Sequence, residues 1–239
     1  WDPVYLFTPY GMDARGLKYV GSQARASALA MDKDRTKLAL RGLGVNLPAH
    51  VIVTAAELAG GVPSIALPVV VKPVDQGSSV ATFIVRDKAD LPAALRAVVE
   101  RYGRARVEQF IAGDELTVGL LDYEPLPPLC IRPKRPFYDY EAKYHAEDTE
   151  YLFEAGFSVG LLSEARMQSL RVFRHLGCRH LGRVDWIVDA DGRLWFLEVN
   201  TIPGFTSHSL VPKAAAHVGI PFDQLVERLV LLALEERHI

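Results

Sequence analysis

The chain has 239 residues, of which 49% are hydrophobic, and its formal net charge is −2 at neutral pH. This apolar content is enough for one or two packed domains, and the balanced charge argues against a nucleic-acid-binding surface. No apolar run reaches the roughly 20 residues that a membrane-spanning helix needs, and the two cysteines are too few for a disulfide framework, so we expect a cytoplasmic protein without a membrane partner.

The first half of the chain contains alternating signals for helices and strands. Residues 22–45 have helical spacing and end in a glycine-containing capping signal. Short β-branched runs at 48–53, 67–73 and 78–85 predict strands, and residues 90–103 predict a helix with an acidic start and a terminal glycine. Two further strands are predicted at 105–111 and 114–121.

The second half begins with a long stretch that has no periodicity. Residues 135–156 are polar and aromatic and predict a loop, of a length that is usually functional or disordered. Helices are predicted at 163–177, 211–219 and 221–237, and a β-hairpin at 182–200. This mixture of strands and helices predicts an α+β or mixed α/β architecture.

The predicted hairpin has polar side chains at its open end. Asp191 and Gly192, between two apolar runs, predict a two-residue turn. With that turn, Asp185 faces Glu198, and the residues two positions away along each strand lie on the same face. Facing carboxylates have Cβ atoms about 5 Å apart and repel each other by roughly 3 kcal/mol at an effective dielectric of about 20.

Two interpretations of this acidic pair are open. On a solvated sheet edge the two charges would simply avoid each other. The hairpin is apolar on both faces, however, which favours burial and a bound cation. Oxygen ligands favour Mg²⁺, which usually binds together with phosphate groups.

Candidate phosphate-binding groups lie elsewhere in the chain. Lys72 ends the predicted strand 67–73, and residues 77–79 (Gly-Ser-Ser) lie between two strands, where their backbone N–H groups can form a phosphate nest. Lys33 lies in a predicted helix, where a solvated surface lysine is the simpler interpretation. Glu108 and Glu115 are individually unremarkable.

The order of these motifs resembles the D-alanine–D-alanine ligases of the ATP-grasp superfamily. The resemblance begins near Tyr19 and rests on ASALAMDKDRTK, VVKPVDQGSSV, EQFIAGDELTVG, YDYEAKY, GRVD and EVNTIPGFTSHSLVP. It implies the ATP-grasp fold, in which the nucleotide lies between two α+β subdomains. These are expected at 22–115 and 116–239, with residues 1–21 a remnant of an N-terminal substrate domain.

The resemblance implies an ATP site. Lys33 and Lys72 match the lysines that hold the phosphates, and Glu115 matches the acid that binds the ribose hydroxyls. The implied ATP-binding residues are Lys33, Lys72, Glu108, Gln109, Phe110, Ile111, Glu115 and Lys143. Of these, residues 108–111 read the adenine through their backbone, and Lys143 contacts ATP from the long loop.

The resemblance also implies the metal and substrate sites. Asp185, Glu198 and Asn200 match the ligands of two Mg²⁺ ions, which Mn²⁺ can replace. Arg183 and Gly204 match groups that stabilise the reacting centre, and Ser209 and Leu210 match the cradle for the second substrate's carboxylate. Ser78 and Tyr144 match a catalytic pair that ties the long loop over the site.

The implied activity joins two D-alanine molecules through an acyl phosphate, for peptidoglycan precursors, in a homodimeric enzyme. One alternative is a related ligase with another acceptor such as D-lactate, although relatives that form depsipeptides usually replace Tyr144. The other alternative is an ATP-binding fragment that does not join substrates, because residues 1–21 lack the family's N-terminal glutamate and His-Gly motif.

Overall fold

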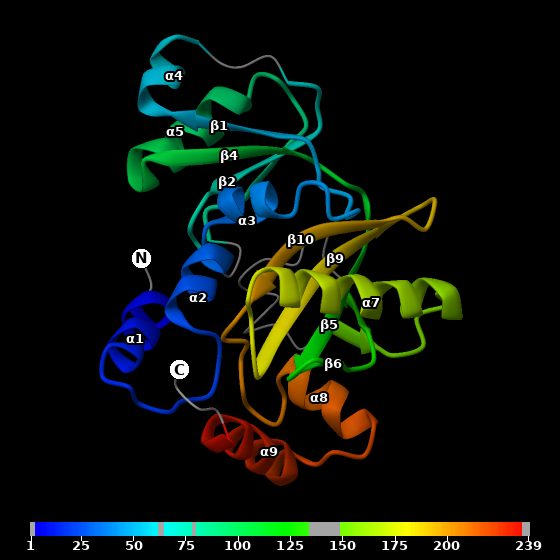
Figure 1. Ribbon diagram of the computed structural model, residues 1–239. Coiled ribbons are helices and arrows are strands. Elements are labelled where there is room, and N and C mark those ends of the chain that lie inside the picture. The colour runs from blue at the N-terminus through cyan, green and yellow to red at the C-terminus, as the bar shows by residue number, and fades with distance from the viewer. Residues whose placement is uncertain (1–2, 62–64, 78–79, 134–148, 236–239) are drawn as a thin grey trace.

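A computed structural model describes residues 3–61, 65–77, 80–133 and 149–235 (Figure 1). The chain forms two antiparallel sheets, which confirms the mixed α+β prediction. Helix α1 (Pro3–Asp13) packs against α2 (Ala24–Met31). Within the described residues, no helix has both the length and the apolar character needed to cross a membrane.

The first sheet has four strands in the order β1-β4-β2-β3. They are β1 (His50–Thr54), β2 (Val69–Pro73), β3 (Phe83–Val85) and β4 (Arg104–Gln109). Helix α5 (Leu91–Tyr102) packs its apolar side chains on one face, and α4 (Ala55–Ala59) follows β1. Helix α3 (Lys33–Ala39) contacts the opposite face through Lys37, which reaches Glu108 of β4.

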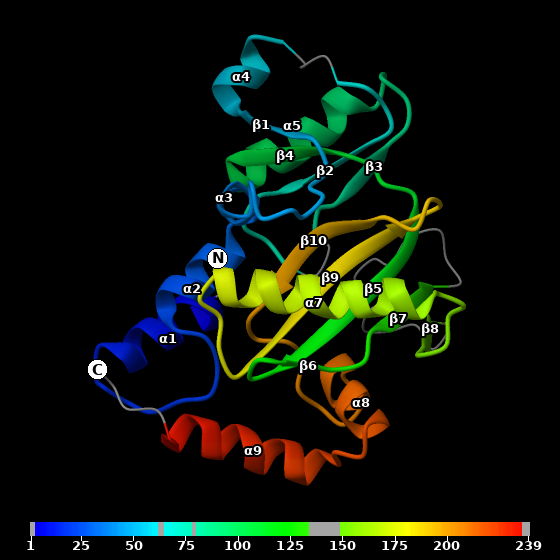
Figure 2. The same cartoon turned by 45° about the vertical axis from the view of Figure 1, so that its right-hand side comes forward.

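The second sheet has six strands, with the order β10-β9-β5-β7-β8 and β6 paired to β5. They are β5 (Gly113–Leu121), β6 (Glu124–Pro125), β7 (Leu129–Pro133), β8 (Thr149–Leu152), β9 (Leu181–Asp189) and β10 (Leu194–Asn200). Helix α7 (Val159–His175) covers one face, where Trp186 and Phe196 meet edge to face with ring centroids 5.7 Å apart. Helices α8 (Leu210–His217) and α9 (Phe222–Glu235) pack at the end of the sheet near β6 (Figure 2).

The predicted helix at 22–45 is wrong as a single element. It is two helices, α2 and α3, because the Asp32 carboxylate accepts hydrogen bonds from the backbone N–H groups of Asp34 and Arg35, at 3.1 and 3.0 Å. This side chain caps a new helix in a new direction. Similarly, α7 begins at Val159 and not at residue 163, because Ser158 accepts a hydrogen bond from the Leu161 N–H at 3.2 Å.

Five of the described elements were not predicted: α1, α4, β6, β7 and β8. Strand β8 lies within the predicted loop 135–156 and pairs with β7, so its partner lies outside the local sequence. Helix α4 has a complete capping box between Thr54 and Glu57, but it is only five residues long. The predicted boundary between subdomains at residue 115 falls inside β5, just after the connection between the two sheets.

Candidate active site

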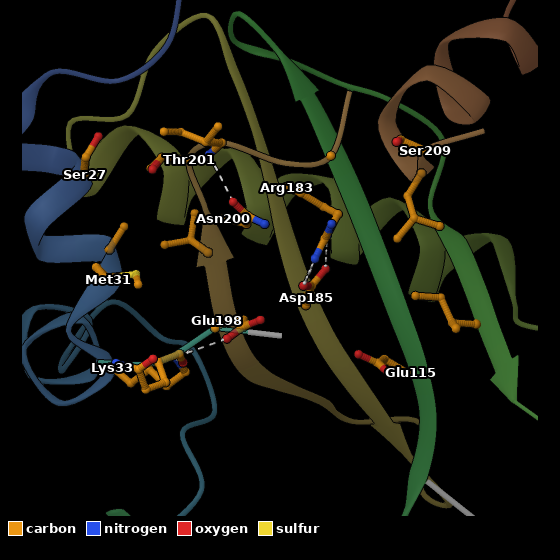
Figure 3. Close-up of a pocket in the computed structure, with 18 of the residues that line it drawn as sticks. Ser27, Met31, Lys33, Glu115, Arg183, Asp185, Glu198, Asn200, Thr201 and Ser209 are labelled. Carbon is orange, nitrogen blue, oxygen red and sulfur yellow. Dashed lines mark hydrogen bonds and ion pairs between the residues drawn. The ribbon is translucent and has the colours of Figure 1, made fainter. Parts of the chain in front are cut away.

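A cavity of about 710 Å³ lies where α2, the start of α3, strands β5, β9 and β10, and the start of α8 meet (Figure 3). The structure brings nine of the predicted site residues to its wall: Lys33, Glu115, Arg183, Asp185, Glu198, Asn200, Gly204, Ser209 and Leu210. These residues come from segments far apart in the sequence. Their convergence depends on the pairing of β5, β9 and β10.

The hairpin brings the two acids together as predicted, but its turn differs from the prediction. Glu198 faces Asp185 and Asn200 faces Arg183. The predicted two-residue turn is wrong, because Asp189 pairs with Arg193 across a three-residue loop in which Gly192 has a φ of +76°. A β-bulge between Phe196 and Glu198 then shifts the register by one residue.

The bulge also decides which side chains of β10 lie in the core. A regular ladder from a two-residue turn would place Trp195 and Leu197 on the same face as Trp186. Instead Phe196 pairs with Trp186 and is fully buried, while Trp195 and Leu197 are half-buried. Because the bulge adds a residue, Phe196 lies in the core and Glu198 still reaches the site.

Asp185 is held by two neighbours and is 3% exposed. Thr117 of β5 donates to its Oδ1 at 2.6 Å, and Arg183 donates through Nε to Oδ1 and through Nη2 to Oδ2, both at 2.9 Å. Burial opposes the charge on Arg183, but Asp185 outweighs this effect with help from Glu198 and Glu115, so the pKa of Arg183 is raised. The guanidinium is therefore a fixed positive charge in the pocket.

Glu198 lies near a second cation. The Lys33 Nζ is 3.6 Å from Glu198 Oε2 and also donates to the Gln76 carbonyl oxygen (Figure 3). Burial lowers the pKa of Lys33, with Lys72 adding to this effect and Glu198 opposing it. The amide oxygen of Asn200 accepts from the Ile202 N–H at 3.0 Å, which fixes the direction of that side chain.

The donor chemistry of this face fits Mg²⁺. Two carboxylates and one amide oxygen project from one end of β9 and β10, and oxygen donors suit this ion. Among the described residues, no group of three or more His, Cys, Asp or Glu side chains could hold a metal ion, and the donors on this face are two carboxylates and one amide oxygen. Arg183 and Lys33 supply the positive charge near the two acids in this structure.

The loop before α8 forms the opposite wall. The Ser209 Oγ accepts from the Thr206 N–H at 3.0 Å, and a Cβ added at Gly204 would lie 3.2 Å from that Oγ. Ser209 is the N-cap of α8 and Leu210 is its first residue. The backbone N–H groups at such a helix start favour a bound anion.

The other predicted site residues that the structure describes do not line the cavity. Lys72 and Glu108 belong to a buried ion network, in which Lys72 Nζ lies 3.1 Å from Glu108 Oε1. Lys37 and Arg106 join this network, and with Lys72 they hold the pKa of Glu108 well below its usual range although burial opposes its charge. The structure does not bring residues 109–111 to the cavity wall. The predicted residues Ser78, Lys143 and Tyr144 lie outside the described part of the chain.

Thr117 and Tyr151 are among the neighbours of the site that were not predicted. Thr117 lies two residues after Glu115 on the predicted strand 114–121, so the sequence indicates that the two side chains share a face. The contact of Thr117 with Asp185, however, depends on the β5–β9 pairing. Tyr151 lines the cavity, and Lys213 Nζ lies 4.0 Å from the centre of its ring. No local signal marks Tyr151, because β8 itself was not predicted.

Comparisons with known proteins agree with this arrangement. Residues 42–231 match the family described as the D-ala D-ala ligase C-terminus. The D-alanine–D-alanine ligase of Marinobacter nauticus is 44% identical over 224 residues, covering 92% of this chain and 68% of that protein. Two crystal structures of ligases also superpose on the chain.

The D-alanine–D-alanine ligase of Bacillus anthracis complexed with ATP has a TM-score of 0.81 and 29% identity, covering 96% of this chain and 74% of its own. The VanG D-Ala:D-Ser ligase of Enterococcus faecalis has a TM-score of 0.84 and 29% identity, covering 94% of this chain and 68% of its own. The family match and the two-sheet fold lead to one conclusion: the chain has the ATP-grasp fold and belongs to the D-alanine–D-alanine ligase family.

Proposed function

We propose that the protein is an ATP-dependent ligase that joins two D-alanine molecules into D-alanyl-D-alanine for peptidoglycan precursors. Proteins named D-alanine–D-alanine ligase share 41–45% identity with most of the chain. The observation that carries the proposal is the convergence of Glu115, Arg183, Asp185, Glu198 and Asn200 on one cavity, opposite Lys33. Charged groups of both signs around one cavity suit a phosphoryl transfer.

ATP would lie between the two sheets. Lys33 and Lys72 would hold its phosphates, Glu115 its ribose and the backbone of 108–111 its adenine, with Lys143 as a further contact. Asp185, Glu198 and Asn200 would hold two Mg²⁺ ions, which when bound neutralise the phosphate charge. A related structure that contains ATP supports the nucleotide part of this proposal.

The reaction would proceed in two steps. A carboxylate oxygen of the first D-alanine attacks the γ-phosphorus, ADP leaves and an acyl phosphate forms. The amine nitrogen of the second D-alanine then attacks the acyl carbon, phosphate leaves and the new amide nitrogen loses a proton. Arg183 and the Gly204 N–H would donate to the developing oxyanion, since fixed donors aimed at new charge lower the barrier.

Two groups of residues would position the substrates. Ser209 and the N–H of Leu210 would hold the carboxylate of the second D-alanine at the start of α8. Ser78 and Tyr144, as the family resemblance implies, would tie the predicted long loop over the site and so exclude water from the acyl phosphate.

The choice of acceptor needs a direct experiment, because a D-Ala:D-Ser ligase has the same fold. ADP release should be measured with D-alanine alone and with D-alanine plus D-serine or D-lactate, and the products identified by mass. We expect D-alanyl-D-alanine as the main product and no release with L-alanine. ATP binding without ADP release for any acceptor would instead support an ATP-binding fragment.

We also propose that the protein acts as a homodimer in the cytoplasm, as the family resemblance implies. Both cysteines are free and buried, which suits a reducing compartment. Light scattering during size-exclusion chromatography should give twice the mass of one chain. A monomer at working concentration would contradict the dimer without affecting the proposed reaction.

A further inference from the structure

Next to the cavity, one carboxylate is surrounded by three basic side chains. Glu108 is 2% exposed, and its Oε2 lies 2.5 Å from Lys37 Nζ and 2.7 Å from Arg106 Nε. Its Oε1 accepts from Lys72 Nζ at 3.1 Å. The proposed function uses Lys72 but gives no role to Arg106 or Lys37, although both are almost completely buried.

The sheet geometry explains why these charges meet. Arg106 and Glu108 are two residues apart on β4 and therefore share a face, while Ala105 and Val107 point into the apolar cluster beneath α5. Lys72 of β2 is the cross-strand partner of Arg106. One face of the central strand is thus occupied by charge and covered by α3.

Arg106 makes a second contact, with the other proposed phosphate-binding lysine. Its Nη1 donates to the Lys33 carbonyl oxygen at 3.3 Å. Lys33 is the first residue of α3, and its side chain lines the cavity. The Arg106 guanidinium therefore contacts the backbone of Lys33 and also the Glu108 carboxylate, which accepts a hydrogen bond from Lys72. Its planar fork can make both contacts together, which a lysine ammonium cannot reproduce.

Stability alone is a poor explanation for this cluster. Buried ion pairs seldom stabilise a protein more than apolar side chains of similar volume. Three cations here share Glu108, and the only further acid near Arg106 among the described residues is the more exposed Asp34, at 3.6 Å. Arg106 Nη2 has no hydrogen-bond partner within the described residues, a cost that an apolar residue would avoid. The excess positive charge lies beside the proposed phosphate site, where a fixed positive potential favours a polyanion.

We propose that Arg106 is a positioning residue for the nucleotide phosphates, a role that rests on the proposed ATP-dependent function. Together with Lys37 it fixes the Glu108 carboxylate, which orients Lys72, and it also fixes the first turn of α3, which carries Lys33. Arg106 itself does not touch the nucleotide. Its contribution is to hold two ammonium groups in place before ATP binds.

The test compares two arginines on the same strand. Arg106→Met removes the buried guanidinium at similar length, whereas Arg104→Met removes an exposed one that lies 3.4 Å from Asp32. Titration calorimetry with ATP and Mg²⁺ should show the Kd for ATP about 10-fold or more higher in Arg106→Met and unchanged in Arg104→Met. The KM for D-alanine should stay within about 2-fold of the unmodified chain in both variants.

A double-mutant cycle separates positioning from a general effect on folding. If Arg106 acts through Lys72, the combined loss of ATP affinity in Arg106→Met with Lys72→Met is smaller than the sum of the two single losses. Additive losses would exclude this route. If Arg106→Met does not fold, Arg106→Lys is used in the same cycle, since it keeps the buried charge but cannot make both contacts.

The two proposals fail in different ways. An unmodified chain that binds no ATP would refute the proposed function. An unmodified chain that binds ATP, with equal affinity in Arg106→Met or Arg106→Lys, would refute only the positioning role and leave Arg106 as a structural residue.

Discussion

The two sheets differ in the charge that one face of each carries and in what covers that face. On the four-stranded sheet, α3 covers a face on which basic groups outnumber acids, and the side chains pair among themselves. On the six-stranded sheet, Glu115, Asp185 and Glu198 line an open cavity, with Arg183 among them. The covered face keeps its ion pairs, whereas the open face can exchange them for a ligand. The proposed function uses both faces.

The largest expected effect is a loss of stability on substitution of Glu108, on the covered face of the four-stranded sheet. Glu108→Gln leaves Lys37 and Arg106 buried without their carboxylate, which should lower the free energy of unfolding by about 3–5 kcal/mol. The folded-state pKa of Glu108 lies well below its usual 4.5, so its stabilising contribution is complete above that pH and is lost as the pH falls through the folded-state pKa.

Urea denaturation at neutral and acidic pH measures this effect. The difference in unfolding free energy between the unmodified chain and Glu108→Gln should shrink as the pH falls below 4.5. A difference that stays constant with pH would contradict the charged state assigned to Glu108.

The next effect concerns the fixed cation of the open face. Arg183→Ala should lower kcat by about 10²–10³-fold, because it removes a donor aimed at the transition state. It should also lower the melting temperature, since Asp185 then keeps only Thr117 as a described partner. Arg193→Ala, at the exposed hairpin tip, is the control and should change neither quantity. Equal kcat values in all three proteins would remove Arg183 from the mechanism.

A smaller effect is expected for metal binding by the acids that line the cavity. Glu198→Gln should raise the Mg²⁺ concentration for half-maximal ADP release by at least about 10-fold, because a neutral amide is a weaker ligand. Electron paramagnetic resonance of bound Mn²⁺ gives a readout that does not depend on turnover. Glu124→Gln, exposed on β6, is the matched control. Unchanged Mn²⁺ binding in Glu198→Gln would contradict the metal assignment.

The smallest expected effect lies at the hairpin tip, outside both faces. Gly192 has a φ of +76°, where a Cβ is unfavourable although no atom lies within 4 Å of its position. Gly192→Ala should therefore lower the free energy of unfolding by about 1 kcal/mol without changing the Kd for ATP. A large loss of ATP affinity would show that the tip and the site are coupled.

Strand spacing predicted the polar end of the hairpin, whereas the other predicted residues that line the cavity came from the family resemblance. Asp185, Glu198 and Asn200 fall on one face under any hairpin with the correct local pairing, and the structure has that pairing. The loop length at Asp191 was wrong, yet the error did not reach the acids, because the bulge at Leu197 shifts the register back by one residue.

What could not be predicted depends on contacts between distant segments. The break at Asp32 is a local side-chain cap inside a run of good helix spacing, and the helical periodicity outweighed it. The burial of Arg106 requires α3 to cover β4, and nothing in the alternating strand 105–111 distinguishes a buried arginine from an exposed one. Strand β8 is defined only by its partner β7.

The bulge at Leu197 has a practical consequence. Because it adds one residue to β10, a three-residue turn is compatible with Glu198 facing Asp185 at the other end of the hairpin. The turn between β9 and β10 projects beyond the rest of the sheet (Figure 1), and Asp191 in this turn is exposed. A cysteine placed there can carry a fluorescent label without displacing Glu198, and the two native thiols, both buried, should not compete for the dye.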